Sequence, residues 1–175
     1  AMLNGSGRLF ANDISASRAR ALLRNIELFG ITNAFVTNET PAHLGKHFPE
    51  FFHKILLDAP CSGEGMFRKE EALARDWTPE KSHELSSLQK ELILQAADML
   101  RPGGLLLYST CTFAPEEDEE VVSHLLENRP DMELLELPEY EGFTSGLPEW
   151  GNGDPSLIRS VHLFPHKMQG EGHFL

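Results

Sequence analysis

Two nearly continuous apolar runs constrain the fold of this chain more than any other feature. They are KILLDA at residues 54–59 and GLLLYSTCT at residues 104–112. Strands with apolar residues at successive positions are typical of parallel sheets that are covered on both faces. Between the two runs, apolar residues recur with helical spacing over positions 85–100, and the RPGG segment at 101–104 is expected to end that helix. The pattern therefore predicts a strand, a crossover helix and a second, parallel strand.

The same alternation continues on both sides of this unit. Strands are expected at 8–14 and 34–38, with a helix over 15–30 that stops at Gly30. After the second apolar run we expect a helix that opens at Pro115, then strands at 132–137 and 160–165. Strands alternating with helices predict an α/β fold with a doubly wound, mostly parallel sheet, formed by one domain over residues 1–175.

The acidic run EEDEE at residues 116–120 follows Pro115 directly. Acids in the first turn of a helix interact favourably with the helix dipole, by about 0.3–1 kcal/mol each. We interpret the run as the acidic first turn of a helix, in preference to a metal-binding run.

Composition indicates a chain without a membrane span. Hydrophobic residues make up 41% of the sequence, and no run approaches the roughly 20 apolar residues that a bilayer requires. No charged-then-apolar leader opens the chain, and its two cysteines are typical of free thiols in a reducing compartment, so a cytoplasmic location is expected. No cysteine and histidine spacing indicates a zinc site.

The net charge of −12 is unevenly distributed along the chain. Residues 1–60 carry +1, residues 61–115 carry −2 and residues 116–175 carry −11. The acidic last third therefore does not exclude an RNA partner for the rest. Basic residues that are expected either to contact phosphates or to form solvated helix faces are Arg18, Arg20, Arg24, Arg68, Lys69 and Arg75.

Polar groups follow four of the expected strands at their carboxyl ends. Asp13, Asn38, Asp58 and Cys111 hold these positions, and ligands of doubly wound sheets bind at that rim. Asp13 fits either a ribose contact or a helix N-cap cluster. Cys61 lies just beyond Asp58 in a tight, glycine-rich turn. Either thiol alone could be a small buried residue, but two of them near a carboxylate favour chemistry.

The segments DAPCSGEGMFRK and YSTCTFAPEEDEEVV, with LRPGG between them and RSVHLFPHKMQGEGHFL at the end, closely resemble the Sun/Fmu (NSUN) family. This family consists of S-adenosylmethionine-dependent RNA cytosine-5 methyltransferases. The resemblance covers nearly the whole chain and implies a Rossmann-like class I methyltransferase fold. Bacterial members mostly modify small-subunit ribosomal RNA, which is the implied substrate.

The resemblance also implies roles for individual residues. Cys111 would be the nucleophile that adds to carbon 6 of cytosine, and Cys61 would assist when the adduct breaks down. DNA cytosine-5 methyltransferases use a cysteine directly after a proline, as Cys61 follows Pro60, but the STCT motif favours Cys111. Asp58 would be a third catalytic residue, which hydrogen-bonds the cytosine ring or the cofactor's methionine end and stabilises the adduct. The implied cofactor contacts are Asp13 to the ribose, Asn38 to the adenine edge, and Asp58 and Pro60 near the methionine.

The resemblance further implies that the chain lacks the family's first, central strand and its glycine-rich cofactor loop, since AMLNGSG has the pattern of a helix end and a turn. We expect weak cofactor binding by this chain alone, and self-association through strand edges that the absent strand would leave open. The alternatives are a non-catalytic RNA-binding fragment and a thiol enzyme of the same fold class that acts on small molecules.

Overall fold

A computed structural model describes residues 6–175 and divides the chain into two compact units, the first ending at Phe48 and the second running from Pro49 to Leu175. The helix end expected around residues 1–5 lies outside the described residues. No helix in residues 6–175 is long and apolar enough to cross a membrane.

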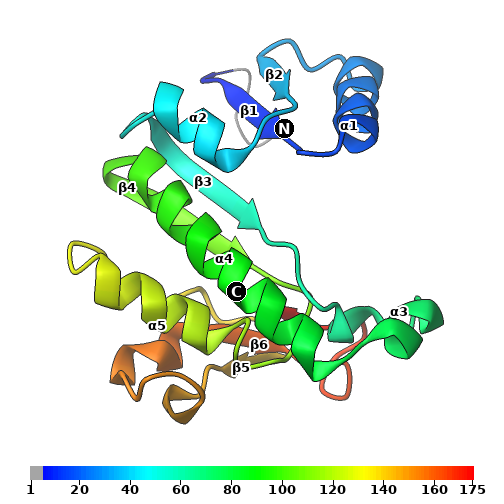
Figure 1. The fold of residues 1–175 in the computed structure, drawn as a ribbon, viewed down its shortest axis with the longest axis vertical. Helices are drawn as coiled ribbons and strands as arrows, with labels where there is room; N and C mark the ends of the chain where they lie inside the picture. The colour runs from blue at the N-terminus through cyan, green and yellow to red at the C-terminus, as the bar shows by residue number, and fades with distance from the viewer. Residues whose placement is uncertain (1–5) are drawn as a thin grey trace. The chain divides into compact units, whose positions relative to one another are not determined.

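The first unit is a strand–helix–strand unit followed by a short helix (Figure 1). Strand β1 (Leu9–Asn12) pairs in parallel with β2 (Ala34–Thr37), and helix α1 (Ala16–Leu28) connects them. Helix α2 (Pro41–His47) follows β2. The strands expected at 8–14 and 34–38, and the helix between them, are confirmed.

Helix α1 ends where its glycine allows a left-handed turn. Gly30 has φ 61°, its N–H donates to the carbonyl of Glu27, and the N–H of Ile31 donates to the carbonyl of Ile26. These two bonds form a Schellman motif, which satisfies carbonyl groups that the helix leaves free at its end. The expected stop at Gly30 is therefore confirmed together with its cause.

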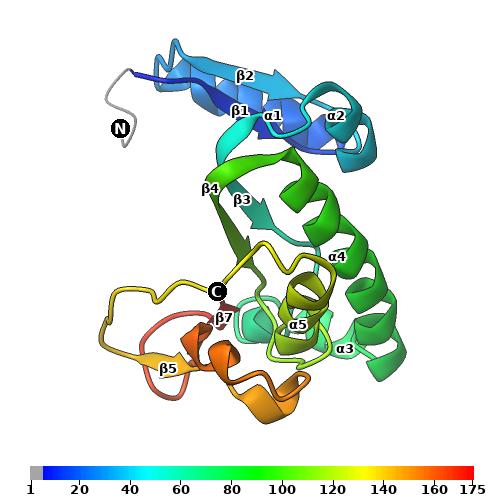
Figure 2. The ribbon, with the colours of Figure 1, turned by 90° about the vertical axis from the view of Figure 1, so that its left-hand side faces the viewer.

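The second unit contains a parallel strand pair, two longer helices and a small antiparallel sheet (Figures 1 and 2). Strand β3 pairs in parallel with β4, while β6 lies between β5 and β7 in antiparallel pairing. Its elements are β3 (Phe52–Asp58), η1 (Glu64–Met66), α3 (Glu71–Asp76), α4 (Pro79–Met99), β4 (Leu100–Ser109), α5 (Glu119–Asn128), β5 (Phe143–Ser145), η2 (Pro148–Trp150), η3 (Pro155–Arg159), β6 (Val161–Leu163) and β7 (His173–Phe174).

Helix α4 is the crossover that the sequence predicts between the two apolar strands, and it runs along one face of the β3–β4 pair (Figure 1). It begins before the expected apolar stripe because Thr78 caps it, accepting a hydrogen bond from the N–H of Lys81, and Pro79 occupies its first turn. Its inner face contributes Ile93 and Ala97 to a core that also contains Tyr108, Val121, Leu157 and Phe174.

The expectation that both apolar strands are buried on both faces is wrong for one face. Leu106 and Tyr108 pack toward the core, whereas Leu56, Leu105 and Leu107 are 67%, 46% and 39% exposed. Side chains alternate across a strand, so the core of the second unit covers only one side of this pair. Among residues 6–175 the parallel strands form two separate pairs, β1–β2 and β3–β4.

Three boundaries differ from the sequence prediction. Residues 132–137 form no strand, because they have no hydrogen-bonded strand neighbour among the described residues, although Leu134 still packs against the core. Strand β4 begins at Leu100 and not at Gly104, because Leu100 pairs with Phe52 across a register shift. Helix α5 begins at Glu119, after a turn over residues 115–118.

Candidate active site

The two cysteines of the chain meet just beyond the carboxyl ends of β3 and β4. Asp58 and Ser109 are partners in the parallel register, and the N–H of Ala59 donates to the carbonyl of Ser109. This pairing brings the following loops together, so that the Sγ atoms of Cys61 and Cys111 lie 3.2 Å apart. The backbone N–H of Cys111 also donates to Cys61 Sγ at 3.3 Å. The predicted convergence of the two thiols is confirmed.

The hydrogen bond between the sulfurs makes the two thiols unequal. It lowers the pKa of Cys111 below that of an ordinary thiol, while burial and the charge of Asp58 oppose this effect. The same hydrogen bond, followed by burial, raises the pKa of Cys61 far above the usual range. Of the two thiols, Cys111 is therefore the one whose thiolate is favoured. Two thiols at contact distance, one of them with a lowered pKa, are an arrangement suited to nucleophilic chemistry.

A close backbone stack fixes the loop that carries Cys61. The N–H of Gly65 donates to the carbonyl of Cys111, and the N–H of Gly172 donates to the carbonyl of Gly65. A Cβ added at Gly65 would overlap the carbonyl oxygen of Gly172 and lie 2.8 Å from its carbonyl carbon, so only glycine fits there. The C-terminal segment closes the same region, because Phe174 forms an antiparallel bridge to Thr110 and is fully buried.

The run EEDEE contributes acids to the first turn of a helix, as expected, but only at Glu119 and Glu120, and its middle is buried. Glu117, Asp118 and Glu119 are all 0% exposed. Each finds donors from distant segments: Thr110 Oγ1 donates to Asp118 at 2.6 Å, and His162 Nε2 and the N–H of Leu147 contact Glu119 at 2.7 and 3.1 Å. Burial raises the pKa of Asp118 well above its ordinary value. The three central acids thus lie in the interior, and Glu117 contacts the Cys61 loop.

Glu117 is a site residue that the sequence analysis missed. Its carboxylate accepts hydrogen bonds from the N–H of Ser62, from Ser82 Oγ and from Gln89 Nε2. A sequence signal for two of these donors exists. Ser82, Ser86 and Gln89 lie on the same face of α4 as Ile93, which places small polar residues in line with the buried apolar stripe.

The remaining predicted residues lie in two places. Asp58 and Pro60 flank the thiol pair and are exposed. Among the described residues, the Asp58 carboxylate has no hydrogen bond or ion pair, so both oxygens are open to a ligand. Asp13 and Asn38 follow β1 and β2 in the first unit.

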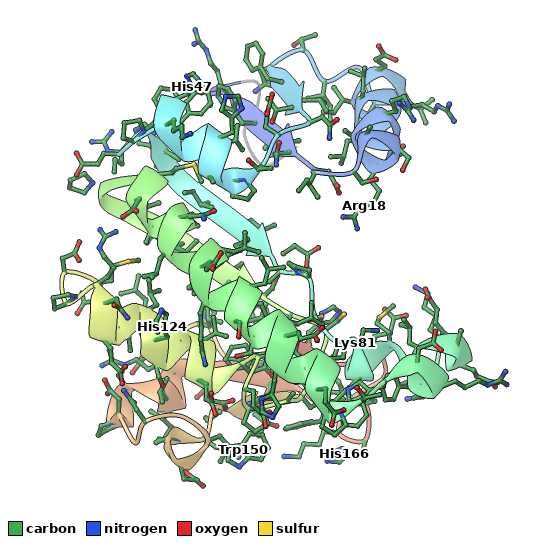
Figure 3. All side chains as sticks on the ribbon, in the orientation of Figure 1. Arg18, His47, Lys81, His124, Trp150 and His166 are labelled. Carbon is green, nitrogen blue, oxygen red and sulfur yellow. The ribbon has the colours of Figure 1, made fainter. Side chains whose placement is uncertain are left out.

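Asp13 and Asn38 are joined by hydrogen bonds within the first unit. The amide nitrogen of Asn38 donates to the backbone carbonyls of Asp13 and Ile14 at 2.7 and 2.9 Å. The Asp13 carboxylate accepts from the N–H of Ser15 and pairs with Arg18, which extends from α1 (Figure 3). Asp13 thus takes part in the helix N-terminus that the sequence allowed, and no hydrogen bond within residues 6–175 uses Asn38 Oδ1.

The basic residues proposed as phosphate contacts are surface groups of both units. Lys69 pairs with Glu171 and Arg75 with Glu71, at 3.2 and 3.7 Å. Arg68 and Lys69 follow η1 directly and are exposed, so they lie on the chain segment that begins at the Cys61 loop.

Two solved structures from Pyrococcus horikoshii share the fold. A methyltransferase homolog protein has a TM-score of 0.84 at 31% identity, with 99% of this chain and 53% of that chain covered. The crystal structure of NSun6 with SFG has a TM-score of 0.83 at 28% identity, with 99% of this chain and 41% of that chain covered.

Curated relatives match along the entire chain. Ribosomal RNA small subunit methyltransferase F of Escherichia coli (strain K12) is 42% identical over 177 residues, and so is the protein of the same name from Shigella boydii serotype 18 (strain CDC 3083-94 / BS512). The match covers 100% of this chain and 35% of each relative. The chain thus spans about a third of the length of these relatives.

The parallel strand pairs, their crossover helices and these structural neighbours define an α/β, Rossmann-like class I methyltransferase fold. The family described as "16S rRNA methyltransferase RsmB/F" matches residues 1–175. The chain belongs to this family of ribosomal RNA methyltransferases.

Proposed function

We propose that this chain carries the catalytic thiols of an enzyme that transfers a methyl group from S-adenosylmethionine to carbon 5 of a cytosine in small-subunit ribosomal RNA. The observation that carries the proposal is the 3.2 Å contact between Cys61 Sγ and Cys111 Sγ. The family supplies the substrate class, since its members are 16S ribosomal RNA methyltransferases. Residues 1–175 would then form part of the catalytic domain.

The chemistry requires a thiolate because carbon 5 of cytosine is a poor nucleophile. The Cys111 thiolate forms a bond to carbon 6, and the displaced electron pair makes carbon 5 an enamine carbon. The cofactor supplies the electrophilic methyl group that carbon 5 attacks. A base, for which solvent water suffices, takes the proton from carbon 5, the C–H electron pair re-forms the 5,6 double bond, and the Cys111 sulfur leaves carbon 6 as a thiolate with the electron pair of the broken C–S bond.

Cys61 assists the departure of the Cys111 sulfur. Its sulfur lies 3.2 Å from Cys111 Sγ, and the hydrogen bond between the two, which lowers the pKa of Cys111, would stabilise negative charge on Cys111 Sγ. Because Cys61 itself has a strongly raised pKa, it stays protonated and remains a donor. The sulfur that leaves carbon 6 is therefore released as a stabilised thiolate.

Asp58 fits the remaining polar position at the rim. Its carboxylate is exposed, unpaired among the described residues and close enough to Cys111 to raise that thiol's pKa by charge repulsion. A carboxylate there would accept a hydrogen bond from the cytosine ring or from the amino group of the cofactor's methionine end. Either contact holds the reacting base or methyl group beside Cys111.

The residues available for the cofactor fit its polar groups. The Asp13 carboxylate would accept hydrogen bonds from the ribose hydroxyls, Asn38 Oδ1 would accept from the adenine amino group, and Asp58 and Pro60 would line the methionine end. Asn38 Oδ1 is suited to this contact because the hydrogen bonds of this side chain within residues 6–175 are donated by its amide nitrogen. The neighbouring NSun6 structure was solved with SFG, an analogue of S-adenosylmethionine, which supports this cofactor.

RNA is the proposed partner, and its target base must be accessible. A cytosine reaches a partly buried thiol only after it leaves its stack, which costs a few kcal/mol and least in single-stranded RNA. Arg68 and Lys69 are placed to contact backbone phosphates near the Cys61 loop. We infer that the target lies in a single-stranded loop.

The proposal is tested by trapping the covalent intermediate. In a chimera, residues 1–175 replace the matching segment of the Escherichia coli relative, and the substrate is small-subunit ribosomal RNA containing 5-fluorocytosine. Fluorine replaces the proton that must leave carbon 5, so a denaturation-resistant adduct is expected to accumulate. Cys111→Ala should abolish this adduct, and Cys61→Ala should retain it. An adduct that survives in Cys111→Ala would disprove the assignment, and RNA binding without any adduct would favour a non-catalytic RNA-binding role.

A further inference from the structure

Hydrophobic packing does not explain why the carboxylate of Glu117 is buried. It is 0% exposed, and among the described residues its hydrogen-bond partners are the neutral donors Ser62, Ser82 and Gln89, at 2.8 to 2.9 Å. Burying a charge without a cationic partner costs several kcal/mol unless hydrogen bonds compensate. The carboxylate therefore acts as an acceptor that holds the Cys61 loop and helix α4 against the turn before α5.

Gln89 extends this arrangement to the other side of Cys61. Its Nε2 group donates both to the carbonyl of Pro60 at 2.7 Å and to Glu117 Oε2 at 2.8 Å, and its side chain is fully buried. The residue before Cys61 is thus held through its carbonyl, and the residue after it through its N–H. Only the thiol between them points away, toward Cys111.

We propose that Glu117, acting with Gln89, is a positioning residue for the thiol pair: the two side chains hold the Pro60–Ser62 loop so that Cys61 faces Cys111. The role rests on the proposed function, because it matters only if Cys111 is the nucleophile. Glu117 does not touch the reacting base. It acts through the loop.

The negative charge of Glu117 and its role in holding the loop predict different effects on the pKa values of the two thiols. The charged or titratable groups that face the sulfurs are Asp58 from β3, Tyr108 from β4 and Glu117 from the turn before α5. The negative charge of Glu117 raises the pKa of both thiols. Neutralising it would therefore move both pKa values in the same direction, and only a loss of position would remove the difference between Cys111 and Cys61.

The test measures which thiol reacts first. The 175-residue chain is treated with limiting iodoacetamide at pH 7, and the labelled peptides are quantified by mass spectrometry. Wild type should label Cys111 in preference to Cys61. Glu117→Ala and Gln89→Met should each reduce this preference by about tenfold, as expected when the pKa values of the two thiols move closer together by about 1. Glu117→Gln should keep the preference, since its carboxamide oxygen still accepts from Ser62 and Gln89 while its nitrogen donates to Ser82 Oγ.

Glu119→Gln is the matched control. Glu119 is an equally buried acid whose partners are His162 and Leu147, outside the Cys61 loop. This variant should keep the wild-type preference. If Glu117→Ala does not fold, Gln89→Met decides alone. A folded Gln89→Met or Glu117→Ala chain with the wild-type preference would overturn the positioning role, whereas the adduct experiment reports separately on the methyltransferase chemistry.

Discussion

Thr110 donates a 2.6 Å hydrogen bond from its Oγ1 atom to Asp118 Oδ1, inside a region where Asp118 is fully buried. The second carboxylate oxygen, Oδ2, is buried without a partner among the described residues. Burial is the main reason that the pKa of Asp118 is well above its ordinary value, and the neighbouring acids add to the effect.

The raised pKa of buried Asp118 predicts that stability depends on pH, and the variant Asp118→Asn should lack this contribution. Because the folded-state pKa of Asp118 is higher than the unfolded one, the folded state binds more protons between the two values, and the free energy of unfolding falls as pH rises through that window. Asp118→Asn keeps an acceptor for Thr110 and carries no charge. We expect it to stabilise the second unit by about 1–3 kcal/mol at neutral pH.

Urea unfolding of wild type and Asp118→Asn between pH 5 and pH 8, followed by tryptophan fluorescence, measures this difference. Both tryptophans, Trp77 and Trp150, belong to the second unit. The gain should grow with pH. Parallel stability curves for the two proteins would contradict the raised pKa of Asp118.

The sulfur pair predicts the reactivity of Cys111 when its neighbour changes. Cys61→Ala removes the donor that lowers the pKa of Cys111, so the midpoint of Cys111 alkylation against pH should move upward. If the midpoint rises by about one pH unit, the thiolate fraction at neutral pH falls about tenfold. Cys61→Ser keeps an O–H donor, so its midpoint of Cys111 alkylation should lie between those of wild type and Cys61→Ala. Stopped-flow alkylation over pH 5–10 measures the midpoints, and an unchanged midpoint in Cys61→Ala would rule out the donor role.

The backbone stack at Gly65 predicts a large loss of stability. In Gly65→Ala the new Cβ would overlap the Gly172 carbonyl oxygen, and both partners are backbone, so neither can rotate away. We expect a loss of about 3 kcal/mol or more, since overpacking and a disrupted hydrogen bond act together.

Gly153→Ala is the control that separates the clash with the Gly172 carbonyl from the general cost of replacing a glycine. It lies in the same unit and has φ 86°, but an added Cβ there meets no atom within 4 Å. Its expected cost is the backbone strain of about 1–2 kcal/mol. Thermal unfolding of the two variants compares the costs, and equal losses would show that the Gly65 contact is unimportant.

The exposed side of the β3–β4 pair predicts self-association of the isolated chain. Strand β3 pairs only with β4 among residues 6–175, and Leu56 on it is 67% exposed. A charged side chain on an edge strand disfavours pairing with a second copy. Leu56→Lys should weaken association several-fold in sedimentation velocity.

Leu135→Lys is the control for added charge. Leu135 is 55% exposed but lies in a segment that forms no strand. This variant should associate as wild type does. If both variants dissociate equally, the effect comes from net charge and not from β3.

The elements that the sequence predicts well are those set by local rules. Gly30 ends α1 because glycine readily adopts the left-handed turn, and the apolar runs form β3 and β4 because short apolar runs bounded by turn residues favour strands. The approach of Cys61 to Cys111 follows in part from the parallel topology, since carboxyl ends of parallel strands share one rim.

The elements that fail depend on partners far away in the sequence. Glu117 has the pattern of an acid in the first turn of a helix, but its donors lie 28 to 55 positions away, at Gln89 and Ser62. The MELLEL segment has strand-like composition, yet a strand also needs a hydrogen-bonded neighbour, which the sequence of the segment does not specify. Local patterns predict elements, whereas burial of charge is decided by tertiary structure.

The bridge between Phe174 and Thr110 also has a consequence for the order of folding. A ribosome releases the chain from its N-terminus, so Cys61 and Cys111 both emerge well before residues 172–175. Phe174, which is buried against Thr110 next to the Cys111 loop, is among the last of these residues to emerge. The packing around the thiols is therefore completed late. A nascent chain therefore lacks the bridge to Thr110 until β7 is in place.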